Sequence, residues 1–120
     1  GKRLATEIED ASIKIYELAS QKAEKNDIIV ADTKFEFGIF HEELMLIDEC
    51  LTPDSSRFWS KSKYHVGQDQ FSYDKQHVRD YLISIGWNKL PPAPKLPEHI
   101  VVETSRKYIE AYERITSRKF

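Results

Sequence analysis

The stretch Ile28-Ile29-Val30-Ala31-Asp32-Thr33-Lys34-Phe35-Glu36-Phe37 changes its hydrophobic pattern part-way along. It opens with an uninterrupted apolar run, which is typical of a buried strand. It then alternates, so that Asp32, Lys34 and Glu36 share one face of a strand while Phe35 and Phe37 point to the other. Residues 38–43 read as a turn and residues 44–49 as a second strand. The sequence therefore predicts a β-hairpin with one charged and one apolar face.

The segments around this hairpin read mainly as helices. An apolar residue recurs every three or four positions over residues 3–25, which predicts an amphipathic helix with the face Leu4, Ile8, Ala11, Ile15 and Leu18. Residues 52–71 read as a loop, and Ser72 as the N-cap of a helix that ends near Ile85. A proline-rich connector precedes a last helix, opened by Pro97, whose stripe is Val101, Thr104, Tyr108, Ala111 and Ile115. The expected class is α+β, an antiparallel hairpin packed by three helices.

Composition excludes several classes of protein. The 120 residues suit one domain or one piece of a larger domain. The net charge of −2 argues against general nucleic-acid binding, and no apolar stretch approaches the ~20 residues of a membrane helix. Cys50 is the only cysteine, so an internal disulfide or a cysteine-based zinc site is excluded, and a reducing cytoplasm is the simplest location.

Charge is divided unevenly between the two halves of the chain. Residues 1–60 carry 7 basic and 13 acidic side chains, a net of −6, and residues 61–120 carry 11 basic and 7 acidic ones, a net of +4. Two such halves can simply pair with each other. They can also hold a metal ion on one side and an anionic ligand on the other.

The charged face of the hairpin is the first candidate for chemistry. If Glu36 faced Asp48 across the hairpin, their β-carbons would lie about 4.5–5.5 Å apart. Two carboxylates at that spacing can share Mg²⁺, and Lys34 on the same face would supply a point charge for a transferring phosphoryl group. The alternative is that this face is merely the solvated side of a sheet, which is the commoner use of alternating charges. The apolar run before it and the carboxylate on the second strand favour a site.

Residues 29–38 closely resemble the signature of phosphoribosylaminoimidazole-succinocarboxamide synthases, the SAICAR synthetase family. Further stretches resemble the same family in the same order: 46–49, 51–59, 72–76, 78–82 and 107–114. The resemblance extends over nearly the whole chain and thins before Asp27 and in the proline-rich connector. The resemblance implies an ATP- and Mg²⁺-dependent ligase of purine biosynthesis. ATP would activate the carboxylate of 5-amino-1-(5-phosphoribosyl)imidazole-4-carboxylate as an acyl phosphate, and the amine of L-aspartate would displace phosphate.

The resemblance also implies roles for individual residues. Glu36 and Asp48 become Mg²⁺–nucleotide ligands, Lys34 a contact to the reacting phosphate or carboxylate, and Asp32 a positioning group. A second set would bind the imidazole ribonucleotide: Ser55, Ser56 and Arg57 from one loop, with Lys75, Gln76 and Arg79 as further substrate contacts. An arginine can hold a phosphate through two parallel hydrogen bonds, and serine hydroxyls can add donors.

By the same resemblance, residues 1–120 correspond to the C-terminal portion of a larger fold that is distantly kinase-like. The N-terminal lobe is not represented, so we expect the chain to be inactive alone and to need that half as a partner. The oligomeric state stays open. One rival is a non-catalytic binding or assembly module. A second is a kinase-like phosphotransferase, which needs a glycine-rich phosphate loop that the four isolated glycines do not provide.

Three residues depart from the pattern of the family. Asp27 and Ser117 stand where glycine is usual, and Cys50 replaces a small aliphatic residue. None of the three belongs to the predicted site.

Overall fold

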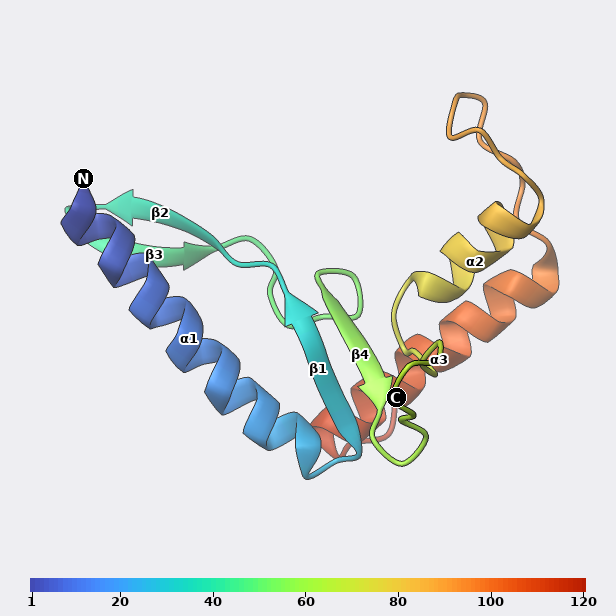
Figure 1. Ribbon diagram of the computed structural model, residues 1–120, viewed down its shortest axis with the longest axis horizontal. Coiled ribbons are helices and arrows are strands. Elements are labelled where there is room, and N and C mark those ends of the chain that lie inside the picture. The colour runs from blue at the N-terminus through green and yellow to red at the C-terminus, as the bar shows by residue number, and fades with distance from the viewer.

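A computed structural model describes residues 1–120 as three helices and four strands (Figure 1). In chain order they are α1 (Lys2–Glu24), β1 (Ile28–Thr33), β2 (Glu36–Phe40), β3 (Glu43–Ile47), β4 (Ser56–Ser60), α2 (Gln76–Ser84) and α3 (Glu98–Thr116). The strands form two antiparallel pairs, β1 with β4 and β2 with β3. This confirms the predicted α+β class. None of the three helices combines the length and the apolar character that crossing a membrane requires.

The strand predicted over residues 28–37 is in fact two strands. They separate at Lys34 and Phe35, where the Lys34 backbone N–H donates to the Ser55 carbonyl at 3.1 Å. β1 therefore leaves the hairpin and pairs with β4, with an irregularity in register between Val30 and Asp32. The prediction of a loop over 52–71 was wrong for β4, whose Phe58 is only 1% exposed.

A hairpin is present as predicted, but β2 and β3 form it, and the turn predicted over residues 38–43 was wrong: residues 38–40 belong to β2 and residue 43 to β3. Its register also differs from the assumed one. Two residues, His41 and Glu42, make the turn, and both have positive φ, as the favoured two-residue hairpin turns require. Glu36 faces Ile47. The assumed pairing of Glu36 with Asp48 was therefore wrong by one residue, and Asp48 lies just beyond the end of β3.

The core is small and lies where α1, the β1–β4 pair and α3 meet. Six buried residues form it: Ala23, Ile28, Val30, Phe58, Tyr73 and Ala111. Of the face predicted for the first helix, only its C-terminal end comes near this core, and Leu18 is 61% exposed. The helix itself was predicted correctly, because its periodicity is a local property of the sequence.

Both later helices differ from their predictions in detail. Ser72 is buried and is not an N-cap: α2 begins at Gln76, whose backbone N–H donates to Asp74 Oδ1 at 2.7 Å. α3 begins at Glu98 directly after Pro97, close to the predicted start. Its buried side carries Ile100, Lys107 and Ala111, whereas Val101 is 51% exposed. The predicted stripe was therefore correct at Ala111 and Ile115, which lie in or against the core, and wrong by one residue at its start, where Ile100 is buried in place of Val101.

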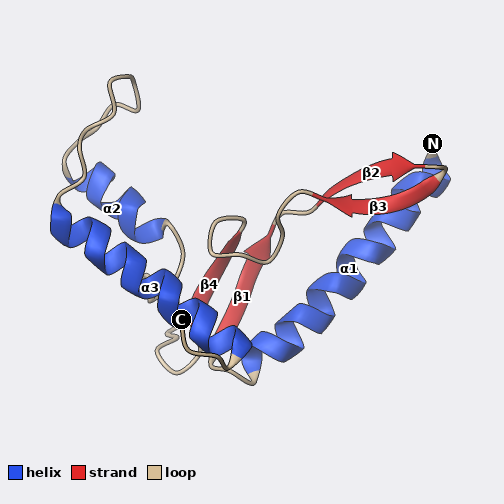
Figure 2. Ribbon diagram, turned by 180° about the vertical axis from the view of Figure 1, so that it is seen from behind, coloured by secondary structure: helices blue, strands red, loops and turns tan.

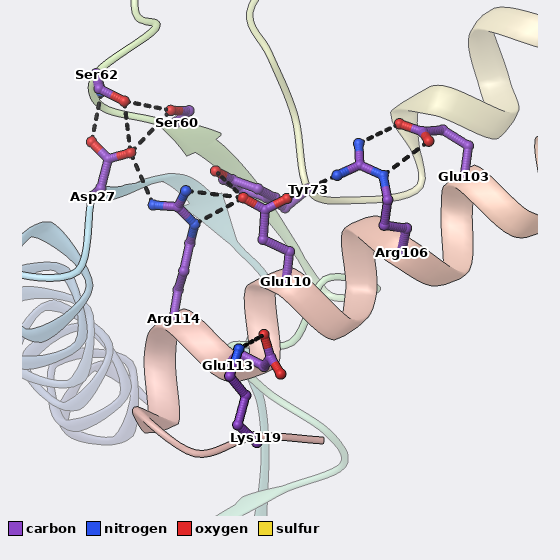
Figure 3. Close-up of polar contacts among 10 residues, drawn as sticks. All are labelled: Asp27, Ser60, Ser62, Tyr73, Glu103, Arg106, Glu110, Glu113, Arg114 and Lys119. Carbon is purple, nitrogen blue, oxygen red and sulfur yellow. Dashed lines mark hydrogen bonds and ion pairs between the residues drawn. The ribbon is translucent and has the colours of Figure 1, made fainter.

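A polar network joins the C-terminal half of α3 to the start of β1 (Figure 3). The Asp27 carboxylate accepts hydrogen bonds from the Ser62 backbone N–H at 2.7 Å and the Ser62 hydroxyl at 2.8 Å. Arg114 donates to the same carboxylate at 3.1 Å and to Glu110 at 2.9 Å. Asp27 and Ser117 have φ of 62° and 57°, a left-handed backbone conformation that glycine adopts more readily than either residue.

Candidate functional site

A cavity of about 340 Å³ lies where β1, β4, the loop after β3 and the start of α2 converge, and no apolar residue lines it. Seven predicted site residues line it: Asp32, Lys34, Ser55, Ser56, Arg57, Lys75 and Arg79. They come from segments separated by more than forty positions in the sequence, so only the fold brings them together. Three further residues complete the lining, Glu49, Asp54 and Asp74. The cavity thus holds four cationic and four anionic side chains.

The pairing of β1 with β4 places Arg57 directly opposite Asp32. Arg57 Nε donates to Asp32 Oδ2 at 2.9 Å, and Nη2 donates to the same oxygen. The Arg57 hydrogen bond lowers the pKa of Asp32, and the Asp32 carboxylate raises the pKa of Arg57. Asp32 therefore orients the guanidinium in the cavity wall, which fits the positioning role predicted for it.

The loop before β4 is ordered by hydroxyl groups. The Thr52 backbone N–H donates to Ser55 Oγ at 3.1 Å, and the Ser55 backbone N–H donates to Thr52 Oγ1 at 3.2 Å. Ser56 Oγ donates to Thr33 Oγ1 at 2.9 Å, which ties the loop to β1. Such reciprocal bonds are typical of turns built on Ser and Thr. They hold Ser55 and Ser56 in the lining of the cavity.

The two cations from the start of α2 differ in their partners. Lys75 Nζ donates to Asp54 Oδ1 at 2.9 Å, and this bond lowers the pKa of Asp54. The Arg79 side chain makes no hydrogen bond or ion pair, so it is the one cation of the cavity without a carboxylate partner. Its guanidinium can therefore take an anionic ligand without first giving up a bond inside the protein.

Lys34 contacts both predicted metal ligands, Glu36 and Asp48, although the register of the β2–β3 hairpin differs from the assumed one. Its Nζ lies 2.5 Å from Glu36 Oε1 and 3.5 Å from Asp48 Oδ2. Glu36 is the main cause of the raised pKa of Lys34. No cluster of three or more His, Cys, Asp or Glu side chains forms a complete metal cage. A pair of carboxylates nevertheless fits Mg²⁺, which usually keeps one or two protein carboxylates and takes its other ligands from water and phosphate.

Three predicted site residues do not line this cavity: Glu36 and Asp48, which contact Lys34, and Gln76. The Gln76 side chain donates from Nε2 to Asp80 Oδ1 at 2.8 Å. It lines a second cavity of about 490 Å³, which shares Arg57 and Asp74 with the first. Sequence reasoning missed Asp54 and Glu49 although both adjoin the recognised loop, and it missed Asp74 because nothing local to Ser72–Gln76 shows that this carboxylate is buried.

The comparison with protein families decides the relationship, since the profile described as SAICAR synthetase matches residues 1–94. The chain belongs to the SAICAR synthetase family. It is similar to the phosphoribosylaminoimidazole-succinocarboxamide synthase of Thermodesulfovibrio yellowstonii, with 56% identity over 117 residues, which are 98% of this chain and 40% of that protein. The Geobacter metallireducens synthase is 53% identical over 118 residues, again 98% of this chain and 40% of the relative.

Solved structures of SAICAR synthetases share the fold. The Saccharomyces cerevisiae SAICAR synthase, solved in complex with SAICAR, is similar with a TM-score of 0.88 at 46% identity and covers 98% of this chain. A SAICAR synthetase solved in complex with ADP has a TM-score of 0.67 at 28% identity and covers 97% of this chain. This chain spans only 40% and 39% of those two structures. It therefore spans about two fifths of the length of the relatives that it matches.

Proposed function

We propose that this chain is the nucleotide- and anion-binding part of an ATP-dependent ligase. The reaction joins L-aspartate to 5-amino-1-(5-phosphoribosyl)imidazole-4-carboxylate and yields SAICAR, ADP and phosphate. The observation that carries the proposal is the convergence of Asp32, Lys34, Arg57, Lys75 and Arg79 on one cavity without apolar lining. The imidazole ribonucleotide has a phosphate at one end and a carboxylate at the other, so it needs cations at two places. The four cations of the cavity meet that need.

The residues fit a reaction that depends on positioning and charge neutralisation. Activation of a carboxylate by ATP spreads negative charge over phosphate oxygens, and fixed cations stabilise that charge. Lys34 lies between the candidate nucleotide ligands Glu36 and Asp48 and the cavity, so its ammonium can reach the group being activated. When bound, Mg²⁺ would neutralise the phosphates of ATP. No cysteine lines the cavity, which suits direct attack by the aspartate amine.

The proposal includes a requirement for the rest of a longer polypeptide. The chain matches relatives that are about two and a half times as long. We propose that it forms the C-terminal portion of their fold, that an N-terminal portion completes the nucleotide site, and that the assembly works in the cytoplasm. Its partners are otherwise small molecules.

Reconstitution tests this function. The chain is mixed with the part of the Thermodesulfovibrio yellowstonii synthase that it does not match, and SAICAR formation from ATP, L-aspartate and the imidazole carboxylate is followed. We expect turnover by the mixture, none by either polypeptide alone, and at least a hundredfold loss with Arg79→Met. The matched control Arg118→Met, at an exposed position after α3, should leave the rate unchanged. Nucleotide binding without turnover in a folded mixture would instead favour a non-catalytic binding module.

A further inference from the structure

Asp74 differs from the other three carboxylates of the cavity because it is buried. It is 1% exposed, whereas Asp32, Glu49 and Asp54 are exposed. A buried carboxylate loses its hydration, and a negative charge in this wall also repels an anionic ligand. The first effect disfavours folding and the second disfavours binding of an anion. The role of Asp74 must therefore come from the contacts that it makes.

Those contacts join the two segments that carry the cations of the cavity. Asp74 Oδ2 accepts a hydrogen bond from the Phe58 backbone N–H at 3.2 Å, and Phe58 follows Arg57 in β4. Asp74 Oδ1 accepts from the Gln76 backbone N–H at 2.7 Å, at the first residue of α2. One side chain thus fixes β4 beside the start of α2, which carries Lys75 and Arg79.

The segment that holds Asp74 is itself anchored from two sides. Ser72 Oγ donates to Asp74 Oδ2, and the Tyr73 backbone N–H donates to the Phe58 carbonyl at 2.8 Å. From α3, Lys107 Nζ donates to the Ser72 carbonyl at 2.8 Å and lies over the Phe71 ring, 4.4 Å from its centroid. Lys107 is only 8% exposed. Because this segment is held rigidly, the Asp74 carboxylate can fix the separation between β4 and the start of α2.

We infer that Asp74 is a positioning residue that sets the separation of Arg57 from Lys75 and Arg79, so that the phosphate of a phosphomonoester ligand is held from both sides. The inference rests on the proposed anion site and adds a residue that does not itself touch the ligand. It predicts a change in anion affinity opposite to the change expected from charge alone. Removal of a negative charge from an anion site should tighten binding by electrostatics alone, whereas loss of positioning should weaken it.

Titration of the 120-residue chain with ribose 5-phosphate, followed by NMR of its ¹⁵N-labelled amides, separates these roles. We expect Asp74→Asn to weaken binding at least tenfold, because an amide cannot accept from Phe58, Ser72 and Gln76 together. The matched control is Asp69→Asn, which removes the same charge from the exposed loop beside the second cavity, where the carboxylate makes no hydrogen bond. We expect this control to bind equally well or more tightly.

Each remaining outcome has a definite meaning. Circular dichroism establishes that the variants are folded at the temperature of the titration. Equal or tighter binding by folded Asp74→Asn would overturn the positioning role and leave the anion site standing. Should that variant fail to fold, Ser72→Ala, which keeps the carboxylate but removes one of its donors, must weaken binding about threefold, and an unchanged affinity would overturn the inference. If the wild-type chain fails to bind ribose 5-phosphate, the proposed anion site itself is wrong.

Discussion

Asp27 shows how one side chain can offset an unfavourable backbone. Its φ of 62° is a conformation in which a side chain costs about 1 kcal/mol, yet its carboxylate accepts hydrogen bonds from Ser60, Ser62 and Arg114 (Figure 3). The Ser62 hydroxyl bond is the largest cause of the lowered pKa of Asp27, with smaller contributions from the Ser62 backbone N–H, Ser60 and Arg114. These bonds tie the start of β1 to the far end of α3.

This network predicts a pH-dependent stability. Because the pKa of Asp27 is lower in the folded than in the unfolded chain, its stabilising contribution is complete above about pH 4 and is lost as pH falls through the folded pKa. We expect Asp27→Asn to lower the free energy of unfolding by about 1–2 kcal/mol at pH 7, with the difference shrinking towards pH 2. Urea unfolding at several pH values measures it. Asp10→Asn on α1 is the control, and a pH-independent difference for Asp27→Asn would contradict the argument.

Glu36 and Asp48 carry a second prediction at the level of single residues. If they hold Mg²⁺–ATP, Glu36→Gln or Asp48→Asn should weaken Mg²⁺-dependent nucleotide binding by at least tenfold in the reconstituted protein. An amide keeps the shape of the side chain but removes the charge that a hard cation needs. Calorimetric titration with a non-hydrolysable ATP analogue, with and without Mg²⁺, measures the effect. Glu43→Gln at the start of β3 is the control, and unchanged affinity in both variants would exclude the metal role.

At the scale of elements, the sequence predicts structure that depends on residues close in the chain. It does not predict strand pairing between residues that are distant in the chain. The α1 helix follows from local periodicity, and the presence of a hairpin follows from alternation, although its turn was placed too broadly over residues 38–43. The pairing of β1 with β4 does not follow from such patterns, because Asp32 and Arg57 are far apart in the sequence and the five-residue strand carries little pattern of its own. The candidate site was largely predicted because family resemblance carries this long-range information. Asp74 was missed because burial is decided by the tertiary fold.

The end of α3 gives a prediction about an element. Ser117 follows the helix with φ of 57°, and its hydroxyl makes no hydrogen bond that would offset the strain. Ser117→Gly should therefore raise the free energy of unfolding by about 1 kcal/mol, which corresponds to about 4 °C in melting temperature. The control is the same change at Ser105 inside α3, which should destabilise by about 0.5 kcal/mol because glycine disfavours a helix interior. A lower melting temperature for Ser117→Gly would contradict the account.

The β2–β3 hairpin links the scale of elements to that of the whole molecule. One of its faces carries Phe37, Ile39, Leu44 and Leu46, and the other carries Gly38, Phe40, Met45 and Ile47 between two glutamates. A strand pair that is apolar on both faces belongs in the interior of a protein. Here Ile39 and Phe40 are more than half exposed. A two-stranded hairpin without cover is only marginally stable, so this element needs a further layer.

The whole molecule has a larger surface area and radius of gyration than a compact domain of its size. Its surface of 8813 Å² exceeds the roughly 6,700 Å² expected for a folded monomer of 14.1 kDa. Its radius of gyration is 17.0 Å, against about 14 Å for a compact domain of this length. Figure 2 shows the reason: α1 and the hairpin extend to one side of the β1–β4 pair, and α2 with α3 extends to the other. The surplus of about 2,000 Å² on this chain alone exceeds the roughly 800 Å² that each partner buries in a standard interface and is on the scale of an obligate one.

This surplus surface predicts that the N-terminal portion proposed above stabilises the chain. A ligand that binds only the folded state at a hundred times its dissociation constant adds about 2.7 kcal/mol, or roughly 10 °C in melting temperature. We expect such a rise, with a 1:1 complex in light scattering, when the unmatched portion of the Thermodesulfovibrio yellowstonii synthase is added. Leu18 lies on α1 and is 61% exposed. The change Leu18→Asp should leave the melting temperature of the chain alone unchanged but reduce the rise that the partner causes. A stable monomer whose melting temperature does not respond to the partner would mean that α1 and the hairpin are not a docking surface.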